Sequence, residues 1–396
     1  MASSNTRKEV QVKQRHGIFR KELNLWQAVA LIVSGTIGAG VLAIPYAVSK
    51  VGMSIGLVYI VLLGLLMIGL NLFVGELSAK TKQDLQLVGL AKRYFGHWGE
   101  YLMSAIYYSI LFGVLLVYIV GEGEVLAVLF GGTALLWSFL FFLIATLVIA
   151  TGMRTVKTVE LVLTFGILLV VLAIALLSST HISIGHLETM NLAYLFFPFG
   201  IVLFAFHGTN AVPEAHALLK DKNTLFKKAI VISGLISIVV YALFAFAIVG
   251  VTGWGTTEIA TIGFGQSVGP LAVLFGNLFA ALAMGTSYIL VGLSLRDSFH
   301  WDYKVPVPVA TALVSIIPAV LFFIGSRHFI AIVDFVGGVF ISFEMLFILV
   351  IYWRAKHVGD LTKSKFKLHH VWLLFAILVF VLSVGAFYSL TSLFVG

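Results

Sequence analysis

Two short stretches of this 396-residue sequence place glycine, proline and polar side chains together inside long apolar segments. They are residues 34–45, SGTIGAGVLAIP, and residues 204–213, FAFHGTNAVP. In each, a proline follows a glycine by five residues, and the two stretches lie 168 residues apart. Glycine costs about 1 kcal/mol and proline about 3 kcal/mol in a helix interior, relative to alanine. The sequence therefore predicts two helices that are interrupted near their middles.

The backbone groups that an interruption frees decide what it can bind. Where the first stretch resumes its helix, at Ala39 and Gly40, free amides and the positive end of the helix dipole suit a carboxylate. Where the first halves stop, near Thr36 and near Phe204 and His207, free carbonyl groups suit an ammonium group. An α-amino acid carries both charges on one carbon and is the predicted ligand. The expected contacts, with glycine leaving room for a close approach at 38, 40 and 208, are Thr36, Ile37, Gly38, Ala39, Gly40, Phe204, Phe206, His207, Gly208 and Asn210.

The composition indicates the surroundings of these stretches. Hydrophobic residues make up 60% of the chain and charged residues 11%, against about 45–50% and about 25% in soluble domains. A soluble core stops growing at about 250–300 residues and still needs a charged surface. A lipid bilayer is therefore the expected solvent and partner. The absence of cysteine excludes disulfides, thiolate metal sites and cysteine nucleophiles.

Eleven apolar runs are long enough to cross a hydrocarbon layer of about 30 Å, which takes about 20 helical residues. The polar and basic segment 1–25 precedes them and is predicted to be cytoplasmic. The sequence thus predicts an all-α integral membrane protein with spans at residues 26–49, 54–79, 99–129, 133–152, 157–179, 191–219, 227–253, 268–296, 306–325, 329–352 and 369–393.

Basic residues fall almost entirely on one side of this arrangement. With a cytoplasmic N-terminus, 23 of the 25 lysines and arginines lie inside, and only Lys50 and Arg327 lie outside. Membrane proteins accumulate basic residues on the cytoplasmic side. We therefore expect a multi-pass protein of the cell's inner or plasma membrane, with its N-terminus inside and its C-terminus outside. The net charge of +8 then reflects topology and not the binding of nucleic acid.

The two interrupted helices stand at matching places, as spans one and six. Interrupted helices in corresponding positions of two halves indicate an inverted-repeat transporter and its binding site. Either break alone equally fits a proline kink or a glycine packing face, but the pairing favours repeats. The predicted organisation is a first repeat at residues 26–179, a second at residues 191–352 and an additional span at residues 369–393.

Residues in both stretches and in spans three and eight resemble the tryptophan/tyrosine permeases and the related amino acid/auxin permeases. The resemblance covers nearly the whole chain. It implies the amino acid/polyamine/organocation superfamily, a LeuT-like fold with a five-plus-five inverted repeat, and an amino acid bound at the interrupted helices. The matching segments are residues 35–52, 118–123, 206–208, 213–214, 286–288 and 292–295.

A coupling cation has a candidate site in span eight. The carbonyl of Ala283 and the hydroxyls of Thr286 and Ser287 lie on one helical turn, and oxygen ligands suit a hard cation. The resemblance to sodium-coupled members of the superfamily implies that the carbonyls of Ser34 and Ile37 complete a Na+ site. The alternative for the two hydroxyls is a hydrogen bond to their own helix.

Acidic residues at membrane depth keep proton coupling as the alternative. Glu344 lies inside span ten and Glu122 in the outer part of span three, and either can carry a proton. Asp334 can pair with Arg327 or act as a gate. His207 can contact the ligand, act as a gate or sense protons, or merely satisfy freed backbone groups. Span five lacks the lysine of some proton-coupled relatives, which favours sodium.

No catalytic motif accounts for the chain. A match to G-x-S-x-G at residues 52–56 opens a membrane span, whereas a nucleophile elbow needs a strand-to-helix turn. We expect no enzyme activity, no cofactor beyond the coupling ion and no obligatory protein partner. A channel is the weaker alternative, because the sequence has no segment repeated at the spacing that a selectivity filter would need. The predicted function is import of neutral, hydrophobic or aromatic amino acids by alternating access, coupled to Na+ or else to H+.

Overall fold

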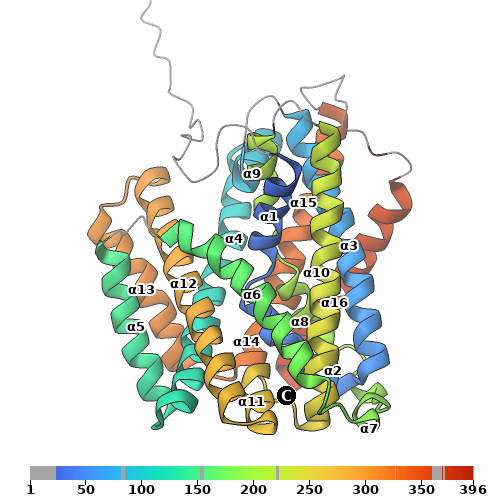
Figure 1. Ribbon diagram of the computed structural model, residues 1–396. Helices are drawn as coiled ribbons and strands as arrows, with labels where there is room; N and C mark the ends of the chain where they lie inside the picture. The colour runs from blue at the N-terminus through green and yellow to red at the C-terminus, as the bar shows by residue number, and fades with distance from the viewer. Residues whose placement is uncertain are drawn as a thin grey trace, which may run out of the picture.

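The structure is a computed structural model that describes residues 24–81, 85–151, 156–219, 223–325, 327–358, 368 and 371–395. These residues form a bundle of helices, with no strand among them. Helix α1 (Leu25–Thr36) starts at the upper end of the bundle, and the C-terminus is marked at its lower end (Figure 1). The predicted all-α class is confirmed.

The helices of the described residues fall into two groups along the chain. The first half contains η1 (Ala39–Leu42), α2 (Ile44–Val51), α3 (Met53–Lys80), α4 (Leu87–Phe130), α5 (Ala134–Thr151) and α6 (Val156–Ser178). The second half contains α7 (Ile184–Leu187), η2 (Leu192–Tyr194), α8 (Pro198–Ala205), α9 (Ala211–Leu218), α10 (Asn223–Thr252), η3 (Gly253–Gly255), α11 (Ala260–Val268), α12 (Pro270–Asp302), α13 (Val307–Ile324), α14 (Phe329–Phe335), the π-helical η4 (Val336–Ile341), α15 (Ser342–Val358) and α16 (Trp372–Val395).

By length and composition, eight helices of the described residues can each cross a bilayer, and α1 with α2 forms a further span bent by 57°. Two other predicted spans also coincide with helices. One is α6, whose apolar part among the described side chains is Leu168–Ser178, and the other is divided between α8 and α9. The protein is therefore a multi-pass membrane protein, while the total of eleven spans stays a prediction.

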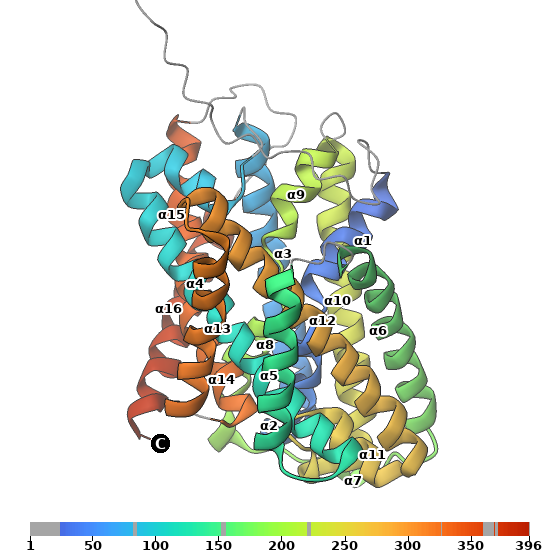
Figure 2. The same ribbon diagram turned by 90° about the vertical axis from the view of Figure 1, so that its left-hand side faces the viewer.

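The outer helices expose apolar stripes. On α5, which lies on the outside of the bundle in Figure 2, Leu140, Ile144 and Leu147 are exposed while Ala145 and Ile149 are buried. Exposed positions at helical spacing make a continuous apolar face. Such a face is stable in contact with lipid, whereas its exposure to water is unfavourable in free energy.

The start of α1 and its end are both determined locally. Asn24 and Gln27 form a capping box, in which each side chain accepts a hydrogen bond from the other's backbone amide, at 2.9 and 3.0 Å. This pair satisfies two amides that a helix start leaves free. The helix ends at Thr36 because Ile37 and Gly38 take extended conformations, with φ of −84° and −116°.

The divided spans lie at the centre of the bundle. Their upper halves are α1 and α9, and their lower halves are α2 and α8 (Figure 1). Every residue of α8 is buried. Gly52, with φ of 100°, joins α2 directly to α3, so the G-x-S-x-G match lies at a corner between two helices and not at a strand-to-helix turn.

Two features of the helices differ from the sequence prediction. Span three continues an earlier helical segment, and α4 is kinked at Gly96, whose φ of 68° favours glycine. Span ten, predicted as one helix, contains the π-helical η4. Gly337 of η4 packs so closely on α8 that a β-carbon there would stand 2.9 Å from Cβ of Phe204. Single π-helical turns are frequent at functional sites.

Candidate functional site

The first break separates α1 from a short 3-10 turn. Ile37 and Gly38 are not helical, and η1 begins at Ala39. The amides of Ala39 and Gly40 come before the first donor of that turn, Val41, whose N–H bonds to the Gly38 carbonyl at 3.3 Å. The amides of Ala39 and Gly40 thus lie at the position where the sequence predicts amides that can bind a carboxylate.

The second break is the five-residue link Phe206–Asn210 between α8 and α9. Tight turns close both of its ends. The N–H of His207 bonds to the Phe204 carbonyl, and that of Ala211 to the Gly208 carbonyl, each at 3.1 Å. The link is thus a compact loop at the centre of the bundle, and both interrupted helices occur where the sequence predicts them.

The two breaks and the helix ends beside them pack directly against each other. A β-carbon on Gly40 would stand 2.7 Å from Cα of Ala205, and one on Gly208 would stand 2.7 Å from Cα of Thr36. No real β-carbon tolerates such distances to backbone, so glycine is required at both positions for the breaks to meet. At both positions the other interrupted helix occupies the place of a β-carbon, and the close approach of a ligand there stays a prediction.

Gly38 is the exception among the three predicted glycines. A β-carbon there would meet only the hydroxyl of Tyr118, at 4.0 Å. Tyr118 belongs to α4 and is 7% exposed. Of Gly38, Gly40 and Gly208, Gly38 is therefore the one where an added β-carbon would meet no atom closer than ordinary contact.

Tyr241 of α10, which the sequence analysis missed, joins the two breaks. Its buried hydroxyl lies 2.7 Å from the carbonyl oxygen of Ala205 and 3.1 Å from that of Thr36. Its ring meets Phe206 edge-on, with centroids 4.8 Å apart. The carbonyls that end α1 and α8 thus accept from a tyrosine, where the sequence predicts them free for an ammonium group. A single tyrosine in an apolar helix carries no motif, so only the tertiary contact reveals it.

His207 of the second break contacts Glu344 of α15. Nε2 of His207 lies 2.6 Å from Oε2 of Glu344. The Glu344 side chain is fully buried and that of His207 is 11% exposed. Both residues are candidates from their sequence positions, but their pairing is not predictable because 137 positions separate them.

The predicted sodium ligands lie on α1, the first break and α12, and α12 meets the first broken span at η1. The Thr286 hydroxyl donates to the Leu282 carbonyl at 2.7 Å and to the Ala283 carbonyl at 3.3 Å. This hydroxyl thus bonds to its own helix, but its oxygen lone pairs can still bind a cation. The Na+ set of Ser34, Ile37, Ala283, Thr286 and Ser287 stays a prediction.

Glu122 of α4 is a second buried carboxylate. It is 2% exposed, and its Oε1 would lie 3.0 Å from a β-carbon on Gly285 of α12. That oxygen has no hydrogen-bond partner. Glu122 therefore faces the α12 turn that carries the predicted sodium ligands and not the second break.

Asp334 of α14 lies at the start of α8. Its carboxylate packs against Gly200, the third residue of α8, where a β-carbon would overlap Oδ1 of Asp334. Arg327 donates from Nε to the carbonyl of Phe322 at 3.2 Å and lies over that residue's ring. The predicted pairing of Asp334 with Arg327 is wrong, because α14 carries the carboxylate inward to α8. Its role as a gate stays a prediction.

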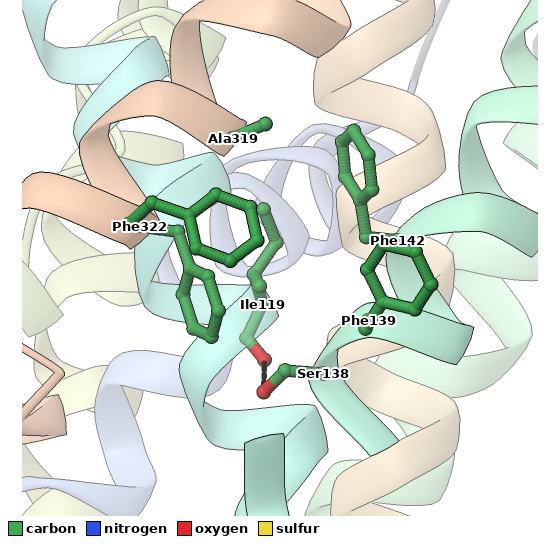
Figure 3. Close-up of a pocket in the computed structure, with 7 residues that line it drawn as sticks. Ile119, Ser138, Phe139, Phe142, Ala319 and Phe322 are labelled. Carbon is green, nitrogen blue, oxygen red and sulfur yellow. Dashed lines mark hydrogen bonds between the residues drawn. The ribbon is translucent and has the colours of Figure 1, made fainter. Parts of the chain in front are cut away.

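A small cavity between α4, α5 and α13 does not suit an amino acid. Its polar side chain, Ser138, donates its hydroxyl to the Ile119 carbonyl at 2.8 Å (Figure 3). A lining without free polar groups cannot orient a zwitterion. The lining residues are Ile119, Ser138, Phe139, Phe142, Ala319, Phe322 and Phe323.

Solved structures with a similar fold define the class. MhsT in complex with L-phenylalanine aligns with a TM-score of 0.66 over 94% of this chain and 100% of that chain, at 14% sequence identity. A manganese transporter of Eremococcus coleocola aligns with a TM-score of 0.66 over 93% of this chain and 87% of that chain, at 15% identity. The chain therefore has the LeuT-like fold with interrupted first and sixth spans.

The sequence then gives the family. Residues 21–392 match the tryptophan/tyrosine permease family, and the chain belongs to it. Tyrosine-specific transport system 1 of Haemophilus influenzae is 26% identical over 356 residues, which cover 82% of this chain and 87% of that protein. Glutamine transporter 2 of Aliivibrio fischeri is 23% identical over 362 residues, covering 85% and 91%. The protein is an amino acid permease and not an enzyme.

Proposed function

We propose that this permease imports neutral amino acids, hydrophobic or aromatic, by alternating access and couples their entry to Na+. The observation that carries the proposal is the meeting of two interrupted helices at the centre of the bundle. In this proposal the substrate carboxylate binds the backbone amides of Ala39 and Gly40, which precede the first hydrogen-bonded amide of η1. Relatives named for tyrosine and glutamine and a similar fold holding L-phenylalanine support this substrate class.

Alternating access in this proposal uses the predicted inverted repeats, residues 26–179 and 191–352. The substrate binds beside Gly38, and the rearrangement of one repeat against the other exposes it to each side in turn. Tyr241 keeps the two breaks in contact during this motion, because its hydroxyl bonds to both. In the proposed topology, residues 1–25 and Lys363 lie on the cytoplasmic side of the membrane, and Gly396 lies on the outer side.

Sodium is proposed at the carbonyls of Ser34, Ile37 and Ala283 and the hydroxyls of Thr286 and Ser287. One positive charge that crosses about 100 mV releases about 2.3 kcal/mol, enough for about fifty-fold accumulation of a neutral substrate. A specific observation favours H+ as the second candidate: the buried contact between His207 and Glu344. The two ions predict different behaviour under separate gradients.

Uptake into proteoliposomes tests the function. Labelled L-tyrosine, L-phenylalanine, L-tryptophan and L-glutamine are offered with a sodium gradient at constant pH, with a pH gradient in sodium-free buffer, and with neither. The proposal expects accumulation of at least one of them under the sodium gradient. Accumulation under the pH gradient alone would assign the coupling to H+, and no uptake of any amino acid under either gradient would refute the proposed function.

The orientation is tested with single cysteines, because the natural chain has none. His97, whose side chain is 74% exposed, precedes the third span, and the exposed Thr180 follows the fifth. In intact cells a membrane-impermeant maleimide should label Thr180→Cys and leave His97→Cys unlabelled until the cells are permeabilised. Equal labelling of both in intact cells would contradict the charge-based topology.

A further inference from the structure

A pocket on the outside of the bundle lies between the end of α15 and the start of α16. The two helices pack against each other, and α16 lies at the edge of the bundle in Figure 2. Because α15 ends and α16 begins here, the pocket stands at one end of two helices that can each cross a bilayer. The lining residues are Tyr352, Trp353, Lys356, Val371, Trp372 and Phe375.

Aromatic rings form most of the pocket. Trp353 is 50% exposed and Trp372 is 61% exposed, and the rings of Trp372 and Phe375 meet edge-on with centroids 6.1 Å apart. The hydroxyl of Tyr352 donates to Oε2 of Glu76 at 2.7 Å and is therefore already bonded within the protein. Tryptophan is enriched where a membrane meets water, with its ring at the level of the lipid headgroups. The pocket thus lies at headgroup depth.

Lys356 supplies the charge of the pocket. Its ammonium group lies over the ring of Trp372, with Nζ 5.4 Å from the centroid. The carboxylate that Tyr352 contacts, Glu76, forms an ion pair with Lys80 at 2.9 Å. Within the part of the chain that the structure describes, no carboxylate pairs with Lys356. Its charge is therefore available to an anion from outside the protein.

The sequence around the pocket is strongly basic. Residues 352–373 contain five lysines and arginines and one acidic residue, Asp360. Basic clusters of this size beside a membrane span attract anionic lipids, and basic pockets between spans bind their headgroups. The charge and the aromatic lining together fit a phosphate diester.

The exposed face of α16 favours a lipid over a free anion. Leu373, Ile377 and Phe380 are 73%, 40% and 67% exposed, and their spacing places them on one face of the helix. This apolar stripe begins beside Trp372 and runs from the pocket along the helix. An acyl chain can lie along it while its headgroup is in the pocket, whereas a soluble phosphate would leave it uncovered.

We propose that the pocket between α15 and α16 binds one anionic phospholipid from the leaflet that faces it. The ammonium group of Lys356 contacts the phosphate, the rings of Trp353 and Trp372 pack beside the glycerol backbone, and an acyl chain follows the stripe on α16. In the proposed topology this is the cytoplasmic leaflet, whose surface is negative. The site lies apart from the two breaks, and the inference does not depend on the substrate or on the coupling ion.

The test titrates the purified protein in non-ionic detergent with phosphatidylglycerol, or with phosphatidylcholine of the same acyl chains. Native mass spectrometry gives the dissociation constant of the first bound lipid. Wild-type protein is compared with Lys356→Gln and with Lys356→Arg, which keeps the charge. Arg354→Gln is the matched control, because it removes a charge from the same helix whose guanidinium group lies over the ring of Phe95, 4.7 Å from the centroid. A further titration includes an excess of glycerol phosphate.

Wild-type protein, Lys356→Arg and Arg354→Gln should bind phosphatidylglycerol more tightly than phosphatidylcholine. Lys356→Gln should lose about fivefold in affinity for phosphatidylglycerol, the equivalent of about 1 kcal/mol for one basic residue at an anionic surface, with its affinity for phosphatidylcholine unchanged. Glycerol phosphate should not displace the lipid. Equal affinity of wild-type protein for both lipids, no loss in Lys356→Gln, an equal loss in Arg354→Gln or displacement by glycerol phosphate would each overturn the inference.

Discussion

The two interrupted helices have similar backbones and different chemistry. Both stop in mid-bundle, both resume within a few residues, and each presents a glycine to the other's backbone. The first break, residues 37–38, has no titratable side chain, whereas the second carries His207 bound to Glu344. The two breaks thus share a backbone geometry, and the second adds a contact between titratable side chains that the first lacks.

The two breaks are also anchored differently. The first is fixed through the packing of Gly40 on Ala205 and the hydroxyl of Tyr241. The second has these contacts and a polar link to span ten, next to a π-helical turn. Single π-helical turns are frequent at functional sites. We therefore expect the second break and span ten to move together, with the first break as the firmer half of the site.

The largest expected effect is on the affinity for Na+ at the site proposed beside the first break. If sodium binds there, Thr286→Val with Ser287→Ala removes two oxygen ligands from a hard cation and lowers sodium affinity by about a hundredfold or more. Thr286→Ser, which keeps the hydroxyl, should change it little. The measurement is the sodium concentration for half-maximal amino acid binding at constant pH. Unchanged sodium activation in the double variant would show that the site beside the first break does not bind the coupling ion.

The second largest expected effect comes from disturbing the contact between the two breaks. Gly40→Ala and Gly208→Ala each force a methyl group against backbone 2.7 Å away, which costs about 1–3 kcal/mol. Substrate affinity should fall by up to about a hundredfold, the equivalent of about 3 kcal/mol. Gly38→Ala has space for its methyl group and should leave the melting temperature unchanged. Binding assays and thermal denaturation compare the three, and equal tolerance of all three would contradict the close packing.

The smallest expected effect separates two buried tyrosines. Tyr241→Phe deprives the carbonyls of Thr36 and Ala205 of their shared donor, at about 1–3 kcal/mol for a buried unsatisfied group. Transport should slow by about tenfold. Tyr288 of α12 is equally buried, but its hydroxyl has no partner, so Tyr288→Phe should be neutral or stabilising. If both variants lose the same stability, Tyr241 has no special role in joining the breaks.

The positions of the breaks follow from the sequence because their causes are local. Thr36 ends α1 where Ile37 and Gly38 abandon helical dihedral angles, and η1 resumes at Ala39 as the glycine spacing predicts. Pro45 lies in the first turn of α2, where its missing amide costs nothing. The π-helical η4 was not predictable, because its glycines meet α8 only in the folded bundle.

The sequence by itself determined the solvent, the helical class, the paired interruptions and the family, because composition, apolar run length and glycine–proline spacing act within a single segment. The tertiary structure alone decided which groups face one another. It placed Tyr241 between Thr36 and Ala205, joined His207 to Glu344 across 137 positions and turned Asp334 away from Arg327 to Gly200. Such contacts depend on the rotation and depth of whole helices against each other, which the packing of many side chains sets together and no local pattern records.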